Sequence, residues 1–439
     1  MKNRIKTFVF SNSLKAADRL PLEQFHHRRE FEVYLINESI EPGERLLDTL
    51  KEILRTKVDD TDEIVLLSNP FHVFTDEYSL QLLVDCIKEA NNLGADMLSG
   101  GVTLFTNVLR VSERLLWIDG FYDLGFLIIF KRYFCTIEQI EFDGTDKLVF
   151  LTKSEKKFLI YPFVSTSNEI LQKENGDANQ PAISKHEIYN ETTFTIQKLI
   201  NVAVAYKKIR PSQATKKRIQ AMIARPRSIP TYVINLPERT DRKAHILAQF
   251  NSKEEFDLEI VEASRHKIGA VGLWQSIRKI IKSAKEEKHD VIIICEDDHE
   301  FTAEYSKDIL FKNIYEGHEQ GVDYMLGGVA VFRHVVPVST TRLWVDVCTS
   351  TQFTIIYNKF FDKLLNADFK NDDVADLFMS ELTINIMLLY PFMSVQKSFG
   401  YSDVTQAHND NSVLLTQLFK RSDQIIRRIQ QAYVKFAHG

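Results

Sequence analysis

The sequence predicts an α/β protein with two tandem copies of one Rossmann-like domain, each with a mostly parallel sheet, joined by a helical linker. Three observations predict this fold: a long internal repeat, apolar runs that alternate with helical stretches, and a polar, basic segment between the repeated regions. The 439 residues suit two or three domains, and 44% of them are hydrophobic, enough for a core in each half. This composition excludes a disordered, collagen-like or small disulfide-stapled protein.

The internal repeat pairs residues 63–134 with residues 290–361 without a gap, at the spacing that separates His72 from His299. About 25 of the roughly 72 paired residues are identical, several times the chance expectation from average composition. A period this long excludes a solenoid and indicates a duplicated globular domain. Glycine, tryptophan and aspartate recur in both copies: Gly94 and Gly321, Gly100–Gly101 and Gly327–Gly328, Trp117 and Trp344, and Asp119 and Asp346.

Short β-branched runs alternate with helical stretches in each half, which is typical of a doubly wound sheet. In the second half, Tyr232–Ile234 and Val291–Cys295 are predicted strands, and Leu273–Lys285 is a predicted helix. Ligands of such sheets bind beyond the carboxyl ends of the strands. We expect four parts: domains at residues 1–165 and 229–405, a polar loop with a basic helical linker at 166–228, and an amphipathic helix at 406–439.

Charge, cysteines and hydropathy narrow the class of protein. A net charge of −5 provides no basic field, so we expect no nucleic-acid partner. The four cysteines lie far apart without a Cys-x-x-Cys pair, which is typical of a reduced, cytoplasmic protein with no cysteine-based metal site. No window approaches the length of a membrane span. We expect any membrane contact to be peripheral, through the basic helices, although packing on its own domain is the favoured interpretation of the helix at Val413–Phe436.

The strongest chemical signal is the triplet Glu296-Asp297-Asp298, directly after a buried strand. Three adjacent carboxylates repel one another, so this arrangement is costly unless a cation is present. Mg²⁺ and Mn²⁺ take oxygen ligands and bridge carboxylates to substrate phosphates. The alternative is a solvated acidic turn or helix start. The first copy has residues 69–71, Asn-Pro-Phe, in the same register, and this difference favours a metal–diphosphate site in the second copy alone.

The second half resembles glycosyltransferase family 25, the lipooligosaccharide and collagen galactosyltransferases, which have the GT-A fold. The resemblance covers most of residues 229–405 and rests on four segments: Tyr232 to Arg242, with an Asn-Leu-x-x-Arg-x-x-Arg turn; Ile268 to Trp274; Ile294 to Asp298; and Pro391 to Gln396 with Ser402 to Val404. The Ser-His pair that the family usually has in the second of these segments is absent. The resemblance implies two tandem GT-A domains, of which the C-terminal copy is intact.

The resemblance implies a metal-dependent, inverting transfer of a hexose, such as galactose, from a UDP-sugar donor to a glycan, lipooligosaccharide or protein-linked acceptor. Mn²⁺ or Mg²⁺ would neutralise the departing diphosphate, and a carboxylate must deprotonate the acceptor hydroxyl. The expected metal ligands are Asp298, Glu296 and Asp297. The expected donor contacts are Asn235, Leu236, Arg239, Arg242, Glu296 and Asp297. The candidates for the base are Asp376, the first choice, Asp373 and Glu381.

Three functions remain open from the sequence. The first is the glycosyltransferase, and the second is a non-catalytic scaffold that binds a sugar nucleotide or a glycan, which the missing Ser-His pair keeps open. The third is a sugar nucleotidylyltransferase, which is disfavoured because neither half begins with a glycine-rich nucleotide loop. We expect the first half to lack metal-dependent transfer, because Lys147 stands opposite Asp376 and Ser11–Leu14 opposite Asn235–Glu238.

Overall fold

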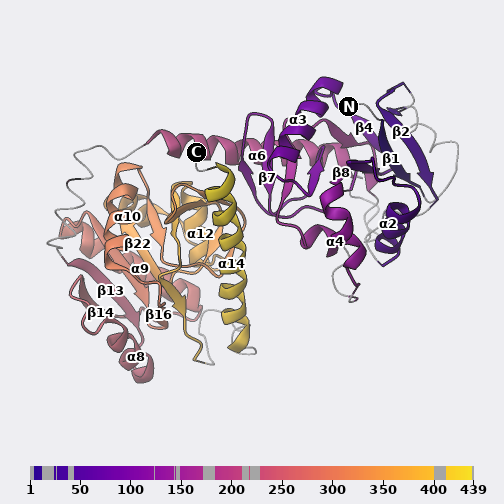
Figure 1. Cartoon of the computed structure of the whole chain (residues 1–439). Coiled ribbons are helices and arrows are strands. Elements are labelled where there is room, and N and C mark those ends of the chain that lie inside the picture. The colour runs from indigo at the N-terminus through magenta and orange to yellow at the C-terminus, as the bar shows by residue number, and fades with distance from the viewer. Residues whose placement is uncertain are drawn as a thin grey trace. The chain divides into compact units, whose positions relative to one another are not determined.

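The structure, a computed structural model, divides the chain into two compact units. One unit comprises Met1–Ile200 with Ala432–Gly439, and the other comprises Asn201–Gln431. In Figure 1 the chain from Met1 to Ile200 runs from indigo to magenta, and the chain from Asn201 to Gln431 runs from magenta through orange to yellow. The structure describes residues 4–11, 24–25, 27–37, 44–122, 124–142, 144, 149–171, 183–209, 217, 228–399 and 412–437.

A mixed eight-stranded sheet forms the centre of the first unit. Its strands are β1 (Ile5–Phe10), β2 (Phe31–Ile36), β3 (Ile64–Ser68), β5 (Met97–Ser99), β6 (Val108–Arg110), β7 (Leu115–Ile118), β8 (Phe126–Phe130) and β9 (Lys157–Ile160). Their order across the sheet is β2-β1-β3-β8-β5-β9-β7-β6. β1 pairs in parallel with β2 and β3, and β5 with β9, whereas β8 runs antiparallel between β3 and β5. The inner strands β3, β5, β8 and β9 are buried along their whole length, as expected of strands covered on both faces.

The second unit repeats this sheet strand for strand. Its strands are β13 (Ile229–Asn235), β14 (Phe256–Glu262), β15 (Val291–Glu296), β17 (Tyr324–Leu326), β19 (Val335–Pro337), β20 (Arg342–Val345), β22 (Phe353–Tyr357) and β23 (Ile386–Leu389). Their order is β14-β13-β15-β22-β17-β23-β20-β19, and β22 runs antiparallel between β15 and β17 as β8 does in the first unit. The α/β class and the duplication that the sequence predicts are confirmed. In each sheet most strands are parallel, and two run antiparallel to their neighbours: β8 and β7 in the first unit, and β22 and β20 in the second.

Local sequence signals explain where two of the helices begin. Ser79 and Ser306 come from the repeated Glu-Tyr-Ser, and their Oγ atoms accept the N–H of the third residue of α3 (Leu80–Asn92) and α10 (Lys307–Glu319), at 3.1 and 3.4 Å. The other helices are α2 (Glu44–Thr56), α4 (Phe134–Gln139), α5 (Val149–Thr152), α6 (Lys185–Lys208), α8 (Thr240–Phe250), α9 (Gly269–Glu286), α11 (Asn358–Asn366), α12 (Ala375–Leu382) and α14 (Ser412–Ala432), with the short helical turns η2 (Lys131–Tyr133) and η3 (Tyr433–Ala437).

A buried histidine–serine pair recurs in both units. A hydrogen bond joins His72 Nδ1 and Ser165 Oγ at 2.8 Å, and its counterpart joins His299 Nδ1 and Ser394 Oγ at 2.7 Å. Burial lowers the pKa of each histidine to about 3, so both are neutral packing groups. The pairs join short ribbons: β4 (His72–Phe74) with β10 (Ser165–Ser167), and β16 (His299–Phe301) with β24 (Ser394–Gln396).

The first long helix, α6, is part of a core rather than only a connection. It buries Tyr189, Ile196 and Leu199 on one face, and the chain up to Ile200 belongs to the first unit. The sequence predicts that residues 166–228 are a linker, but the part up to Ile200 belongs to the first unit. The reason is that the apolar stripe of α6 packs the helix into a core. Of the basic stretch that follows α6, Lys216, Arg218, Arg225 and Arg227 lie outside the described residues.

The C-terminal helix α14 has the same burial pattern as α6. It buries Phe419, Ile426 and Ile429, which have the same spacing as Tyr189, Ile196 and Leu199 in α6. The duplication therefore extends to these helices. The expected C-terminal helix at 406–439 is thus described from Ser412 onward. Ser402–Val404, which belong to the family-like motif, lie outside the described residues, as does Lys147.

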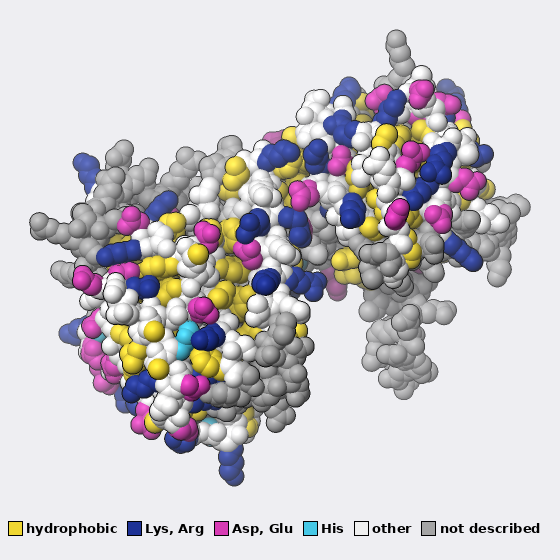
Figure 2. All heavy atoms as spheres, turned by 60° about the horizontal axis from the view of Figure 1, so that its bottom comes forward, with side chains coloured by type: hydrophobic (Ala, Val, Ile, Leu, Met, Phe, Trp, Pro, Cys, Tyr) yellow, Lys and Arg dark blue, Asp and Glu magenta, His cyan; other side chains and the backbone are white. Residues whose placement is uncertain are grey.

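No helix in the described ranges is long and apolar enough to cross a membrane. On the face shown in Figure 2, Lys and Arg side chains are interspersed with Asp and Glu side chains. This mixture agrees with the small net charge of −5.

Candidate functional site

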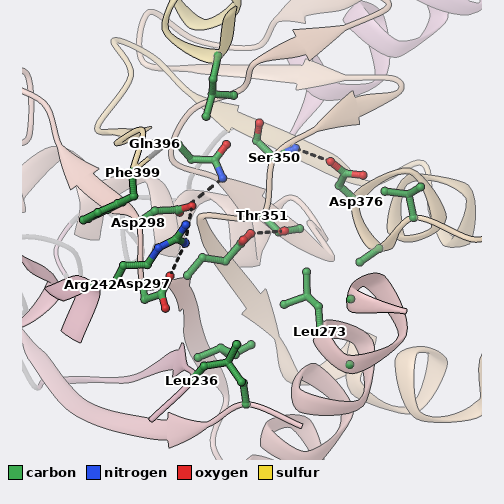
Figure 3. A pocket seen from close by; sticks show the side chains of 18 of the residues that line it. Leu236, Arg242, Leu273, Asp297, Asp298, Ser350, Thr351, Asp376, Gln396 and Phe399 are labelled. Atoms are coloured by element: carbon green, nitrogen blue, oxygen red, sulfur yellow. Dashed lines mark hydrogen bonds and ion pairs between the residues drawn. The ribbon is translucent and has the colours of Figure 1, made fainter. Parts of the chain in front are cut away.

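A cavity of about 730 Å³ lies at the carboxyl ends of β13, β14 and β15 in the second unit (Figure 3). The segments that follow these three strands line it, together with the starts of α9 and α12, residues of α14, and the ribbon of β18 (Val331–Phe332) and β21 (Cys348–Thr349). Sheets of this kind bind their ligands at this edge. The acidic triplet lies in the cavity wall, because β15 ends at Glu296.

Asp297 is paired entirely with protein groups. Arg242, on the first turn of α8, donates from Nη1 to Asp297 Oδ1 at 2.9 Å, and Asn235, the last residue of β13, donates from Nδ2 to Oδ2 at 2.9 Å. The side chains of Arg242 and Asp297 are 6% and 7% exposed. Phe399 covers the guanidinium, whose carbon lies 4.9 Å from the centre of the ring. Asp297 is therefore a buried carboxylate with a resident counter-ion.

The other two carboxylates have either one hydrogen bond, in Glu296, or only long contacts, in Asp298. Glu296 Oε1 accepts a hydrogen bond of 2.6 Å from the Thr351 hydroxyl. Asp298 accepts long contacts of 3.5 Å, from Gln396 Nε2 to Oδ1 and from Arg242 Nη1 to Oδ2. The Asp298 side chain is 16% exposed, more than twice the value for Asp297. Compared with Asp297, Asp298 has weaker contacts and so more lone-pair capacity left for a ligand in the cavity.

Burial and mutual repulsion shift the acidity of this cluster. Burial raises the pKa of Glu296, the negative charge of Asp298 raises it further, and the Thr351 hydrogen bond offsets part of the rise. Burial also raises the pKa of Asp298, against the opposing charge of Arg242. Both carboxylates therefore hold their protons more tightly than in water, and a bound cation would reverse this tendency.

Asp376 lies on the far side of the same cavity from Arg242 and Asp298 in the view of Figure 3. It stands on the first turn of α12, where the backbone N–H groups of Ser350 and Leu377 each donate to its carboxylate at 2.8 Å. Burial raises its pKa, which these hydrogen bonds partly offset. A half-buried carboxylate that lines a cavity and has a raised pKa is suited to accept a proton from a ligand.

The two alternative bases are elsewhere. Asp373 does not line the cavity, and its Oδ2 accepts the Lys370 N–H at 2.6 Å in the turn before α12. Glu381 is exposed on α12 and also lies outside the lining. The structure thus brings together Asp376 and the triplet, and separates Asp373 and Glu381 from them.

The predicted donor-contact residues divide into two groups. Leu236, Arg239 and Arg242 line the cavity, whereas Asn235 is buried behind it and donates to two of its lining residues, Asp297 and the Arg239 carbonyl. Basic side chains that the sequence analysis did not identify, Arg265 and Lys267, follow β14 at the same edge. Arg265 is held by Glu238 in a two-point contact of 2.7 and 2.9 Å.

Three further lining residues had no recognised sequence signal for a role. Thr351 and Ser350 precede β22 and hold Glu296 and Asp376, and Phe399 covers Arg242. Gln396 was noted only as the end of a family-like motif, although it contacts Asp298. A signal for Thr351 exists in the internal repeat: the first copy has Leu124 at this position, where no acidic partner needs a hydroxyl.

A divalent cation fits this donor set only with help from a ligand. Among the described residues, no group of three or more His, Cys, Asp and Glu side chains is arranged to hold a metal ion. The reason is that Asp297 turns to Arg242 and Glu296 to Thr351, so the three carboxylates do not converge. Mg²⁺ commonly uses one or two carboxylates and completes its shell with substrate phosphates. Asp298 and Glu296 suit that kind of site.

The equivalent strand end in the first unit has a different chemistry. Asn69 follows β3, and its Oδ1 accepts the Phe71 N–H at 3.0 Å, which closes a local turn. Phe71, opposite Asp298 in the repeat, is 42% exposed. Neither Pro70 nor Phe71 offers a ligand to a hard cation.

Comparisons with known proteins do not assign the chain to a family. No protein-family model matches it, and no curated protein matches it. Similar solved structures include the "Crystal Structure of A197 from STIV", with 17% identity over 42% of this chain and 91% of that chain and a TM-score of 0.29. Another is an apo-UDP-glucose pyrophosphorylase, with 9% identity over 51% of this chain and 86% of that chain and a TM-score of 0.27. At these identities and TM-scores, neither likeness bears on the function of this chain.

Proposed function

We propose that the second unit is a metal-dependent glycosyltransferase that moves a hexose from a UDP-sugar to a glycan-type acceptor. One observation carries this proposal: the cavity at the strand ends is lined by Asp298 on one side and by Asp376 on the other, each held by protein hydrogen bonds. A donor diphosphate needs a cation, and an acceptor hydroxyl needs a base. Two separate carboxylate positions in one cavity provide for both.

The donor side of the reaction rests on Asp298 and Glu296 and on two basic residues of the cavity, Arg239 and Lys267. Asp298 and Glu296 would hold Mn²⁺ or Mg²⁺, which supplies Lewis-acid stabilisation of the leaving diphosphate when it is bound. Arg239 and Lys267 line the cavity and would pair with phosphate oxygens. Leu236 and Leu273 offer an apolar wall for the nucleoside.

The acceptor side rests on Asp376. Its carboxylate would take the proton of the acceptor hydroxyl as that oxygen attacks the sugar, which favours an inverting transfer. The Ser350 and Leu377 N–H groups fix its orientation and stabilise its charged form. The acceptor classes in this proposal are a glycan, a lipooligosaccharide and a protein-linked sugar.

Release of UDP tests this function. The full chain with Mn²⁺ and a panel of UDP-hexoses is expected to release UDP faster in the presence of acceptor glycans, and chelation of the metal is expected to stop the release. Asp298→Asn should remove the metal-dependent release, whereas Asp373→Asn, outside the cavity, should retain it. No metal-dependent UDP release from any UDP-hexose, with folded protein, would contradict the proposal.

A second candidate is a non-catalytic scaffold that binds a sugar nucleotide or glycan. The Arg242–Asp297 pair favours it, since an arginine already neutralises part of the acidic triplet. In that case a UDP-sugar would bind with the same affinity with and without Mn²⁺ and would not be turned over. Calorimetry under both conditions separates the two functions.

A further inference from the structure

Arg242 occupies a position that the sequence alone assigns to donor binding, yet its contacts are with the protein. Its Nη1 donates to Asp297 at 2.9 Å and lies 3.5 Å from Asp298. Its side chain is 6% exposed, and the Phe399 ring covers the guanidinium. A guanidinium held in this way is a fixed positive charge inside the acidic triplet.

Asp297 is withheld from a metal by the same contacts. Both of its oxygens accept hydrogen bonds of 2.9 Å, one from Arg242 and one from Asn235. To turn an oxygen toward a cation it would weaken one of these bonds, and loss of the bond to Arg242 would leave a buried cation partly unpaired. Asp298 has only contacts of 3.5 Å and a more exposed side chain, so it can turn to a ligand with little loss.

We propose that Arg242 is a positioning residue that couples metal binding to nucleotide binding: it holds Asp297 out of the metal shell and makes a divalent cation depend on the nucleotide for tight binding. The inference rests on the proposed function of this cavity. The Arg242–Asp297 pair is neutral as a unit, so a divalent ion that arrives alone meets much less negative charge than a triplet of carboxylates suggests. A diphosphate brings the missing charge and oxygen ligands.

This arrangement has a thermodynamic signature. Mn²⁺ and UDP should strengthen each other's binding, and the factor is the same in both directions. Removal of the guanidinium should expose the charge of Asp297, so that Mn²⁺ binds without the nucleotide. A residue that only supported the fold would, when replaced, weaken binding or leave it unchanged, but would not create tighter Mn²⁺ binding.

Titration of the full chain with Mn²⁺ alone, and with Mn²⁺ in the presence of UDP, tests the proposal. In the wild type we expect UDP to tighten Mn²⁺ binding ~10-fold or more. In Arg242→Gln we expect Mn²⁺ alone to bind ~10-fold or more tightly than in the wild type, and the effect of UDP to shrink. Arg265→Gln is the matched control, because Arg265 lines the same cavity but is exposed and paired with Glu238. It should change Mn²⁺ binding alone by less than ~2-fold.

A double variant keeps the test valid if Arg242→Gln does not fold. Arg242→Gln with Asp297→Asn removes both charges of the pair and retains polar side chains that can bond to each other. We expect it to bind Mn²⁺ with UDP within ~3-fold of the wild type, because Asp297 is not a ligand. A loss of ~10-fold or more in this variant would make Asp297 a metal ligand and overturn the proposal. So would a folded Arg242→Gln protein that binds Mn²⁺ alone no more tightly than the wild type.

The outcomes separate this inference from the proposed function. A wild type that binds no Mn²⁺ with UDP contradicts the proposed function, whereas the response of Mn²⁺ alone to Arg242→Gln still decides the role of Arg242. Arg242→Lys, which retains the charge, should behave as the wild type toward Mn²⁺ alone.

Discussion

The ends of β3 and β15 occupy the same place in two sheets with the same strand order, yet they present different side chains. After β15 come three carboxylates, and after β3 come Asn69, Pro70 and Phe71. The differences continue around this edge: Leu124 stands where Thr351 donates to Glu296, and Tyr122 where Thr349 lines the cavity. Where the acidic triplet is absent, the residues that would contact it or line its cavity are thus also different.

The interior of the two units did not diverge in the same way. The buried His–Ser pair, the serine cap and the close approach of a glycine to the strand backbone are present in each unit. Core packing and backbone geometry tolerate few alternatives, because a cavity or a clash costs several kcal/mol, about a third of a typical domain stability. A strand end at a cavity has no such constraint. The comparison teaches that both copies can keep the same fold while the acidic residues at the strand end are present in one copy alone.

The largest expected difference between the units concerns Asp298 and Phe71. Asp298→Asn should lower metal-dependent UDP release ~1,000-fold or more, because it removes the carboxylate best placed to hold the cation. Phe71→Asn, at the equivalent exposed position, should leave release within ~2-fold, since surface changes of this kind have small effects. Initial rates of UDP release in both full-length variants measure this. Survival of release in Asp298→Asn would transfer the activity to the first unit.

Asp376→Asn should have the next largest effect. We expect kcat to fall ~100-fold with little change in the KM for the donor, the pattern of a group that acts in the transition state. Asp373→Asn is the matched control, because Asp373 sits three residues away and bonds only to a turn N–H outside the cavity. A normal kcat in Asp376→Asn would leave Glu381 or a retaining mechanism to be examined.

Replacing a glycine at equivalent positions of the two units should lower the stability of each unit by a similar amount. A Cβ on Gly101 would lie 2.1 Å from the carbonyl oxygen of Ser165, and one on Gly328 would lie 2.0 Å from that of Ser394. Gly101→Ala and Gly328→Ala should therefore each lower the free energy of unfolding of their unit by ~2 kcal/mol or more. Unfolding in urea, with hydrogen exchange used to monitor each unit separately, measures this. A large effect in only one unit would show that the repeated geometry is not equally demanding.

The last expected effect is a dependence of stability on pH. The pKa of His72 is lowered from the ordinary 6.5 to about 3 in the folded state, so the unfolded chain takes up a proton first as the pH falls. Stability is fully present above pH 6.5 and is lost below it, by ~1.4 kcal/mol per pH unit down to the folded pKa. His72→Gln should reduce this slope in the first unit. Thermal unfolding of the wild type and of His72→Gln between pH 6 and pH 4 measures this slope. If the two proteins lose stability at the same rate, the folded state already binds a proton at His72.

Some features could be predicted from the sequence because they depend on short patterns. The buried run that ends at Glu296, the serine before α10 and the missing carboxylates after β3 are all legible in stretches of a few residues or in the repeat itself. The role of α6 could not be predicted in this way. Its polar, basic surroundings indicated a linker, whereas the burial of Tyr189, Ile196 and Leu199 depends on where the rest of the unit places its apolar face.

The sequence by itself determined the duplication, the α/β class and the position of the acidic triplet at a strand end, since periodicity and repetition are properties of the chain. Only the tertiary structure decided which carboxylate faces the cavity. Arg242 and Asp297 are 55 residues apart, and so are Thr351 and Glu296, while Asp376 comes from a different helix altogether. Such partners are chosen by the packing of strands and helices against one another, and in a buried cluster each carboxylate takes the donor that the packing brings within reach.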